Sequence, residues 1–307
     1  MPCAGDSIIP SPTLMHITRL ILIVFLAGFV VSGCTRKKDD APPVATPSAK
    51  LNRTEAAVGS PIDVSYRFVM ASNAQPLKED YTVFVHVLDT DRQRLWGDDH
   101  QPPTPTHEWQ PGSTVEYSRT MFVPRLPYVG DARIEVGLYS RKTGERVPLA
   151  GESTGDRAIR VASLSIRPAN SAYFVVFKSG WHDPETTDAG GTEWQWSKKQ
   201  GIVSFRNPKR DTLVLIQLDQ PAMALQEPQQ VEIRAGQAVV DSFPLPVGRE
   251  ELRRISLTPQ QMGSDDTVEL AVAVDKTFVP ASIPQLKSAD SRELGVRVFH
   301  VFVEPKQ

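Results

Sequence analysis

The chain has 307 residues, with 34 basic and 36 acidic side chains and a net charge of −2. A chain with charges so evenly balanced shows no electrostatic footprint for nucleic acid, so we expect no nucleic-acid partner. Only two cysteines are present, Cys3 and Cys34. This leaves little room for disulfides or for a metal site built from cysteine thiolates.

An uninterrupted apolar run covers residues 20–33, with Arg19 before it and small residues at its end. This is the pattern of the hydrophobic region of a secretory signal. The run is shorter than the roughly 20 apolar residues that span a bilayer comfortably. Its last residues and the next one read VSGC at positions 31–34, which resembles the lipobox of bacterial lipoproteins. The resemblance implies a signal peptide over residues 1–33 and a palmitate-type lipid on Cys34 as membrane anchor.

An uncleaved membrane anchor is the alternative for this segment. Arg36, Lys37 and Lys38 come directly after the apolar run, and the positive-inside rule then opposes export of the C-terminal part of the chain. The short length and the small-residue end favour the lipoprotein signal. The sequence leaves open whether Met1 or Met15 is the true start.

Removal of residues 1–33 would leave Cys34 as the one remaining cysteine of this sequence, and the lipobox resemblance implies that its thiol carries the lipid. Disulfides, a Cys-ligated zinc site and thiol catalysis are then excluded from the mature protein. We expect no cofactor, no metal and no catalytic residue. The mature chain of roughly 270 residues favours two domains rather than one.

Residues 34–50 are predicted to be the lipidated cysteine and a flexible tether. The stretch TRKKDDAPPVATPSAK, over 35–50, is rich in proline, alanine and charge and has no apolar period. In Gram-negative lipoproteins an aspartate after the lipidated cysteine tends to retain the protein in the inner membrane. Thr35 stands there instead, so the resemblance implies the outer membrane, facing the periplasm or the cell surface.

From residue 51 onward the hydrophobic period is two. Residues 62–68 alternate apolar and polar side chains, and Val83, Val85 and Val87 share one face of a second segment. Turn signals separate these segments, and no helical period is sustained. The pattern predicts an antiparallel β-sandwich over 51–167. Its expected strands are 62–68, 81–88, 114–123, 132–139 and 158–166.

The same region carries an ordered series of motifs. They are YTVFVHVLD at 81–89, DDHQPP at 98–103, WQPG at 109–112, VGLY at 136–139 and GER at 144–146. The series resembles an immunoglobulin-like accessory module at the C-terminal end of some bacterial and archaeal membrane glycosyltransferases. It implies an immunoglobulin-like fold and an association with envelope glycans. It does not imply transferase activity, because the chain has no multi-span membrane part.

Asp98, Asp99 and His100 have the chemistry of a hard-cation site or a proton-transfer pair. However, they lie in a proline-rich loop, and neighbouring side chains on an extended chain point apart. We favour a hydrogen-bonded loop in which the aspartates cap backbone amides. His86 is interpreted as a structural strand residue.

A second β-sandwich, jelly-roll-like, is predicted over 168–307. Its expected strands are 173–177, 202–205, 212–218, 230–234, 239–243, 254–257, 267–274 and 294–303. Its distinctive motifs are GWHDPE at 180–185, EWQWS at 193–197, TFVP at 277–280 and DSRELGV at 290–296. This set is similar to sandwich domains appended to envelope glycosyltransferases, which look like carbohydrate-binding modules.

Aromatic and acidic side chains crowd together in the first two of these motifs. Aromatic faces stack on the apolar face of a pyranose while flanking carboxylates accept hydrogen bonds from its hydroxyl groups. Two tryptophans two residues apart on a strand share a face, however, and such a face is usually the core. Whether the stretch is a surface site or core is open from the sequence. The candidate glycan-binding residues are Trp181, His182, Asp183, Glu185, Trp194 and Trp196.

The predicted function is non-catalytic binding or organisation of an envelope polysaccharide by a lipid-anchored protein. A structural adaptor for a protein partner in a glycan synthesis or export complex is the alternative. Asp183 and Glu185 as the paired carboxylates of a glycosidase are a third, weaker hypothesis. Asp290, Arg292 and Glu293 are expected to close a loop by charge-assisted hydrogen bonds.

Overall fold

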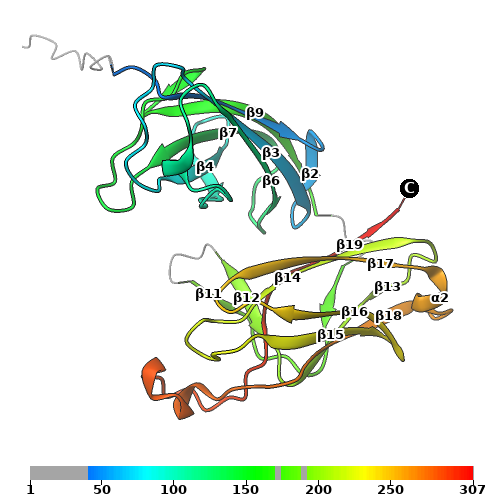
Figure 1. Cartoon of the computed structure of the whole chain (residues 1–307). Helices are drawn as coiled ribbons and strands as arrows, with labels where there is room; N and C mark the ends of the chain where they lie inside the picture. Colours follow the sequence, from blue (N-terminus) through cyan, green and yellow to red (C-terminus); the bar gives the residue numbers. More distant parts are fainter. Residues whose placement is uncertain (1–40, 170–173, 188–191, 307) are drawn as a thin grey trace, which may run out of the picture. The chain divides into compact units, whose positions relative to one another are not determined.

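The computed structural model describes residues 41–169, 174–187 and 192–306, and Pro42–Gln307 form one compact unit. The described residues form four β-sheets with one short α-helix and a few 3-10 turns (Figure 1). This confirms the predicted all-β class with tandem sandwiches. The predicted signal peptide, Cys34 and the tether up to residue 40 lie outside the described residues.

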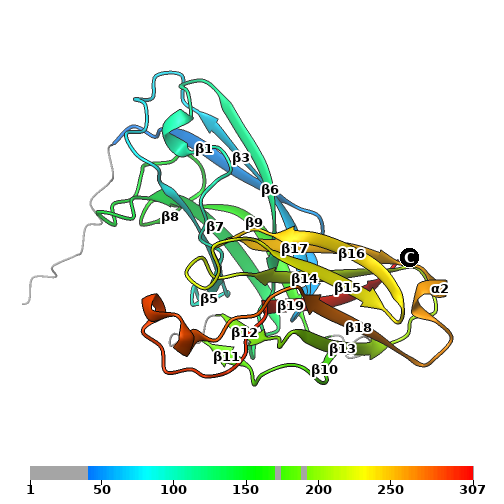
Figure 2. The same cartoon turned by 60° about the horizontal axis from the view of Figure 1, so that its bottom comes forward.

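The first sandwich consists of a three-stranded sheet and a six-stranded sheet (Figure 2). The small sheet has the order β1 (Ala45–Leu51), β3 (Pro61–Met70) and β6 (Thr114–Phe122). The large sheet has the order β2 (Glu55–Ala57), β9 (Ala158–Arg167), β7 (Gly130–Tyr139), β4 (Thr82–Leu88) and β5 (Arg94–Gly97), with β8 (Ser153–Gly155) paired to β9. The β2–β9 ladder is parallel, and the other ladders between these strands are antiparallel.

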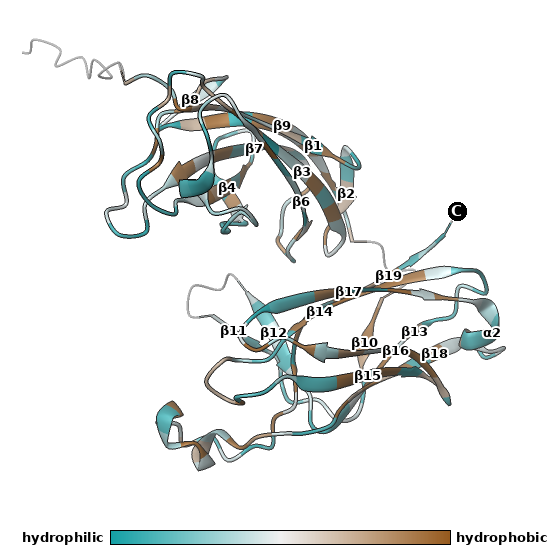
Figure 3. Cartoon of the chain, viewed as in Figure 1, coloured by the Kyte–Doolittle hydropathy of each residue, from teal (hydrophilic) through white to brown (hydrophobic). Residues whose placement is uncertain are grey.

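The core of the first sandwich follows from the alternation seen in the sequence. On β3, Ile62, Val64, Tyr66 and Phe68 are buried in the core, while Asp63, Ser65 and Arg67 between them face away from it. Val83, Val85 and Val87 of β4 face the same core, as predicted. Figure 3 shows that hydrophobic and hydrophilic residues both occur along individual strands. Burial of such side chains contributes roughly 1.5–3 kcal/mol each before conformational entropy is counted.

The flexible tether predicted up to residue 50 overlaps the first strand of the sandwich. Residues 45–51 form strand β1, which pairs with β3 from Ala45 opposite Met70 to Leu51 opposite Val64. Small residues and a proline conceal the alternation of this strand, whose Ala45 and Pro47 are buried. A proline is tolerated there because β1 is an edge strand, where one row of amides has no ladder partner. The prediction of a flexible tether is therefore wrong for residues 45–50.

The second sandwich consists of two five-stranded sheets. The first has the order β10 (Val176–Phe177), β13 (Gln200–Arg206), β18 (Thr267–Val274), β15 (Gln229–Ala235) and β16 (Ala238–Leu245). The other has the order β11 (Glu185–Thr186), β12 (Glu193–Trp196), β19 (Arg297–Pro305), β14 (Thr212–Asp219) and β17 (Glu250–Leu257). Figure 1 shows β14, β17 and β19 in one layer and β15, β16 and β18 in the other.

Two hydrophobic clusters fill the second sandwich. The larger lies between the sheets and includes Val214, Ile233 and Leu270. The smaller joins Trp196, Phe278 and Leu294 at the side where β12 meets the loop before β19. The unpredicted helix α2 (Pro259–Met262) begins at Thr258 with a capping box, a local signal too short to show a helical period.

The strands before and after residue 170 form separate sheets and separate hydrophobic clusters. Strand β9 ends at Arg167, where the predicted boundary begins. Since residues 42–307 form one compact unit by contacts, the division into domains at 167/168 stays a prediction. Across the described ranges, no helix is both long enough and apolar enough to cross a membrane.

Candidate functional site

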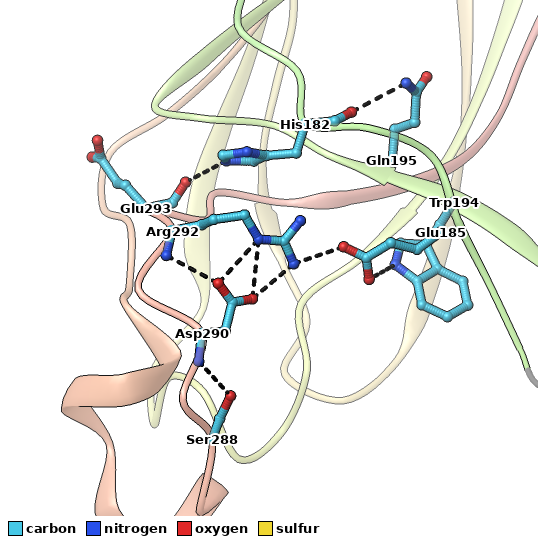
Figure 4. Close-up of polar contacts among 8 residues, drawn as sticks. All are labelled: His182, Glu185, Trp194, Gln195, Ser288, Asp290, Arg292 and Glu293. Atoms are coloured by element: carbon cyan, nitrogen blue, oxygen red, sulfur yellow. Dashed lines mark hydrogen bonds and ion pairs between the residues drawn. The ribbon is translucent and has the colours of Figure 1, made fainter.

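The candidate site lies where β11, β12 and the loop leading into β19 come together (Figure 4). Strand β11 pairs with β12 so that Glu185 is opposite Trp194. Strand β12 then pairs with β19, with Trp196 opposite Arg297. This register places β11, β12 and the start of β19 beside one another, although β19 lies far from the other two strands in the sequence.

Arg292 is the centre of the polar cluster. Its Nε donates to Asp290 Oδ1 at 3.0 Å and Oδ2 at 3.1 Å, and its Nη2 donates to Oδ2 at 2.7 Å. The guanidinium lowers the pKa of the Asp290 carboxyl, and the aspartate in turn raises the pKa of Arg292. The Arg292 side chain is 38% exposed. Its Nη1 makes no hydrogen bond to the described residues, so one face of the fork is open for donation.

Glu185 bridges Arg292 to the tryptophan. Its Oε1 lies 2.7 Å from Arg292 Nη2 and forms an ion pair with it. The geometry of this contact is not that of a hydrogen bond, and Oε1 has no other hydrogen-bond partner among the described residues. Its other oxygen, Oε2, accepts from Trp194 Nε1 at 3.2 Å. The Trp194 ring also faces the Arg297 guanidinium, 5.3 Å from the ring centre. These contacts fix the orientation of a ring that is only partly buried.

Three further hydrogen bonds connect the segments around the cluster. His182 Nε2 lies 2.8 Å from the backbone oxygen of Glu293, so this nitrogen carries the proton. Gln195 Nε2 donates to the backbone oxygen of His182 at 3.2 Å. On the far side, Thr277 Oγ1 donates to Glu293 Oε1 at 2.7 Å. The site is therefore held by hydrogen bonds before any ligand arrives.

Three of the predicted glycan-binding residues come together in this cluster. His182, Glu185 and Trp194 all take part in it (Figure 4). Asp183 is exposed, and its carboxylate makes no hydrogen bond or ion pair with the described residues. Trp196 is 7% exposed and packs edge-on against Phe278, with ring centres 5.6 Å apart.

Trp181 packs against the larger cluster of the second sandwich. Its Nε1 donates to the backbone oxygen of Ile202 at 2.8 Å, and its ring meets Phe177 edge-on at 4.8 Å. A Cβ at Gly201 would lie 2.4 Å from the ring, so glycine there makes room for it. The ring is partly buried, and these contacts tie its orientation to the core.

The expected pairing of Arg292 with Asp290 is confirmed, but the Glu293 carboxylate accepts from Thr277 Oγ1 and does not pair with Arg292. The link of Arg292 to Glu185 was not predicted, because the two residues are far apart in sequence and nothing local pairs them. Arg297 was also missed. Trp194 and Trp196 both face its guanidinium, at 5.3 and 5.6 Å, and it pairs with Asp219. The shared contact confirms that the two tryptophans lie on one face.

Asp98, Asp99 and His100 form an internal network of the first sandwich. Asp99 Oδ1 accepts from the Val85 amide at 3.2 Å, and Asp98 pairs with Arg119 at 3.1 Å. The His100 side chain is 4% exposed, and burial lowers its pKa. This confirms the hydrogen-bonded loop. Within the described ranges, no group of three or more His, Cys, Asp or Glu is placed to hold a metal ion.

His86 lies on β4, half-buried, with its ring 4.8 Å from that of Phe84. Desolvation lowers its pKa, and the positive charge of Arg94 acts in the same direction. These surroundings agree with a structural strand residue.

The arrangement around Arg292 suits a ligand rich in hydroxyl groups. Carboxylate oxygens accept hydrogen bonds from hydroxyl groups, and a guanidinium donates hydrogen bonds to hydroxyl oxygens in a fixed plane. A partly exposed indole offers an apolar face beside them. The site combines these three elements on β11, β12 and the loop before β19, at one side of the second sandwich.

No family model and no curated protein matches the chain. Solved structures to which it is similar include carbohydrate-binding modules of the β-sandwich type. A family 35 carbohydrate-binding module from an environmental isolate is 9% identical, covering 43% of this chain and 97% of that one, with a TM-score of 0.27. The CBM22-1-CBM22-2 tandem domain of Paenibacillus barcinonensis Xyn10C is 8% identical, covering 85% and 93%, with a TM-score of 0.28. Bacteroides uniformis β-glucuronidase 2 is 10% identical, covering 86% and 30%, with a TM-score of 0.24. TM-scores this far below 0.5 transfer no function to this chain.

Proposed function

We propose that the protein is a cell-envelope lipoprotein that binds polysaccharide without catalysis. The observation that carries the proposal is the Glu185–Arg292–Asp290 cluster beside the partly exposed Trp194. Both carboxylates are already paired with Arg292, which suits binding of hydroxyl groups better than the proton transfers of a glycosidase. The protein would hold a glycan chain in place.

Attachment to the membrane through lipid on Cys34 rests on the sequence. The apolar run over 20–33 and the VSGC motif support it, and Thr35 supports an outer-membrane address. Anchoring would keep a binding protein next to an envelope polymer and so raise their effective concentration. The mass of the N-terminal peptide of protein purified from membranes tests the lipid at Cys34.

The binding experiment compares two arginine variants of the full chain, purified in detergent. Arg292→Gln removes the centre of the cluster, and Arg249→Gln changes an exposed arginine of the same sandwich whose side chain pairs with none of the described residues. Retention is measured on immobilised peptidoglycan, lipopolysaccharide and capsular polysaccharide. We expect Arg292→Gln to weaken retention at least tenfold, because a hydrogen bond from a charged group contributes about 1.5–3 kcal/mol. Arg249→Gln should bind as wild type.

Equal retention of both variants would show that the cluster is not the binding site. A structural adaptor is the second candidate, and an observation on β16 favours it. This strand is the edge of its sheet, and its Val239 is 47% exposed. Unpaired strand edges are where other chains add to a sheet. No polysaccharide retention, with one envelope protein co-purifying instead, would replace the proposed function by the adaptor.

A further inference from the structure

A polar groove of about 660 Å³ lies on the first sandwich, on the outer face of its large sheet. The backbone alternation shows which residues face it. Ala132 and Leu164 are 4% and 1% exposed and point into the core, so their strand neighbours Asp131 and Ser165 point outward. The volume is within the range of small-molecule sites.

Strand register places three polar residues in one row across the floor of the groove. Glu55 of β2 is opposite Ser165 of β9, and Ser165 is opposite Asp131 of β7. Directly opposite residues on neighbouring strands are about 5 Å apart. The row therefore reads carboxylate, hydroxyl, carboxylate.

Three arginines around this row are fixed by contacts of their own. Arg167 makes a bidentate contact with the Glu55 carboxylate. Its Nη2 donates to Oε1 at 2.6 Å, and its Nε donates to Oε2 at 3.2 Å. Arg160 Nη2 donates to Ser163 Oγ at 3.0 Å.

The third arginine builds one wall of the groove. Arg133 Nη2 donates to the backbone oxygen of Thr90 at 2.9 Å and to that of Asp89 at 3.4 Å. The Asp89 side chain in turn accepts from the amides of Asp91 and Gln93, which closes the β4–β5 turn. The turn is thus tied to the sheet, and the wall is preorganised.

The groove leaves both a donor and an acceptor unused. The Asp131 carboxylate and the Ser165 hydroxyl make no hydrogen bond to the described residues. The lining is balanced in charge, so it gives no net attraction to an ionic ligand. Its three cations and three anions are Arg133, Arg160, Arg167, Glu55, Asp89 and Asp131.

We propose that this groove is a second glycan-binding surface, selective for a neutral, hydroxyl-rich chain segment. Hydroxyl groups both donate and accept, so they match the free Asp131 and Ser165, and a neutral ligand matches the balanced charge. The inference rests on the proposed function for its class of ligand. Two surfaces on one chain would bind the same polymer with an avidity above either affinity.

The test titrates the full chain in detergent with maltohexaose, cellohexaose and mannohexaose as neutral probes. Hexagalacturonate is the acidic probe. We expect Asp131→Ala to weaken binding of a neutral probe at least tenfold, because it removes a charged acceptor. The matched control is Asp211→Ala, an exposed aspartate whose carboxylate pairs with none of the described residues. Amide chemical shifts of the groove residues show where the probe binds.

The two proposals can fail separately. Unchanged affinity in Asp131→Ala with a loss in Arg292→Gln would overturn the groove and support the Arg292 site. A loss in Asp131→Ala alone would support the groove and remove the site at Arg292. Tighter binding of hexagalacturonate than of the neutral probes, or no binding of any probe, would overturn the inference.

Discussion

An arginine–aspartate pair holds a loop in each sandwich, but the two pairs have different surroundings. In the first sandwich, Arg119 pairs with Asp98 beside His100, whose side chain is 4% exposed. In the second, Arg292 pairs with Asp290, and its side chain is 38% exposed. The two ion pairs are exposed to a similar degree, with Arg119 and Asp98 at 36% and 19% and Arg292 and Asp290 at 38% and 25%. What differs is the neighbour, because a buried imidazole encloses the first cluster on one side and the second, open cluster has none.

In the enclosed cluster around His100, the imidazole makes its hydrogen bonds to other groups of the protein. His100 Nδ1 lies 2.7 Å from the backbone oxygen of Asp98, and its Nε2 lies 2.8 Å from Tyr117 Oη. Both ring nitrogens therefore have internal partners. In the open cluster, Arg292 Nη1 makes no hydrogen bond to the described residues. The difference predicts that the first cluster maintains the fold, and it supports the proposal that the second cluster binds a ligand.

Removing the imidazole of the enclosed cluster should have the largest effect. His100→Ala leaves Tyr117 Oη without its partner and opens a cavity next to Tyr66, whose ring is 5.3 Å away. We expect the free energy of unfolding to fall by about 3 kcal/mol. Urea unfolding followed by residue-resolved hydrogen exchange measures the loss in the first sandwich. A change below about 1 kcal/mol would mean that the enclosure is not structural.

The pH dependence of stability should separate the clusters next. Burial lowers the pKa of folded His100, while the unfolded chain binds this proton at about pH 6.5. Unfolding therefore takes up a proton at His100 as the pH falls below about 6.5, and this one residue lowers the free energy of unfolding by at most about 1.4 kcal/mol per pH unit. His300 adds to the same slope, since burial lowers its pKa to about 4.

The open cluster responds in a different pH range. Arg292 lowers the pKa of Asp290, so the stabilisation of the fold by this ion pair is present above about pH 3.9 and is lost as the pH falls below it. Urea unfolding at intervals between pH 7 and 5 should show a shallower slope for His100→Gln than for wild type. Arg292→Gln should keep the wild-type slope there. Identical slopes for all three proteins would contradict the assignment of His100.

The sequence was sufficient for the strands whose alternation is long. The expected strands 114–123, 212–218 and 267–274 correspond to β6, β14 and β18 within a residue or two. Strands of two to four residues, such as β5 and β11, are too short to show a period. Strand β1 was missed because its buried positions are small residues and a proline.

The candidate site was only partly predictable for a related reason. A local motif names residue types, and Trp194 and Glu185 were found in this way. Their contact with Arg292 depends on the register of β11, β12 and β19, which no local pattern contains. The groove on the first sandwich is a row across three strands, and it too depends on register.

The open cluster should be nearly dispensable for folding. Arg292→Gln removes ion pairs to Asp290 and Glu185, but solvent reaches all three side chains, at 38%, 25% and 31% exposure. Exposed ion pairs contribute about 0–1 kcal/mol, so we expect a loss of stability within that range. Thermal unfolding of Arg292→Gln beside Arg249→Gln measures it. A loss of several kcal/mol would make the cluster structural like its enclosed counterpart, and any loss of binding would then be a loss of fold. A loss near zero, with binding weakened, would leave ligand recognition as the reason that two acids and an arginine are held together at this surface.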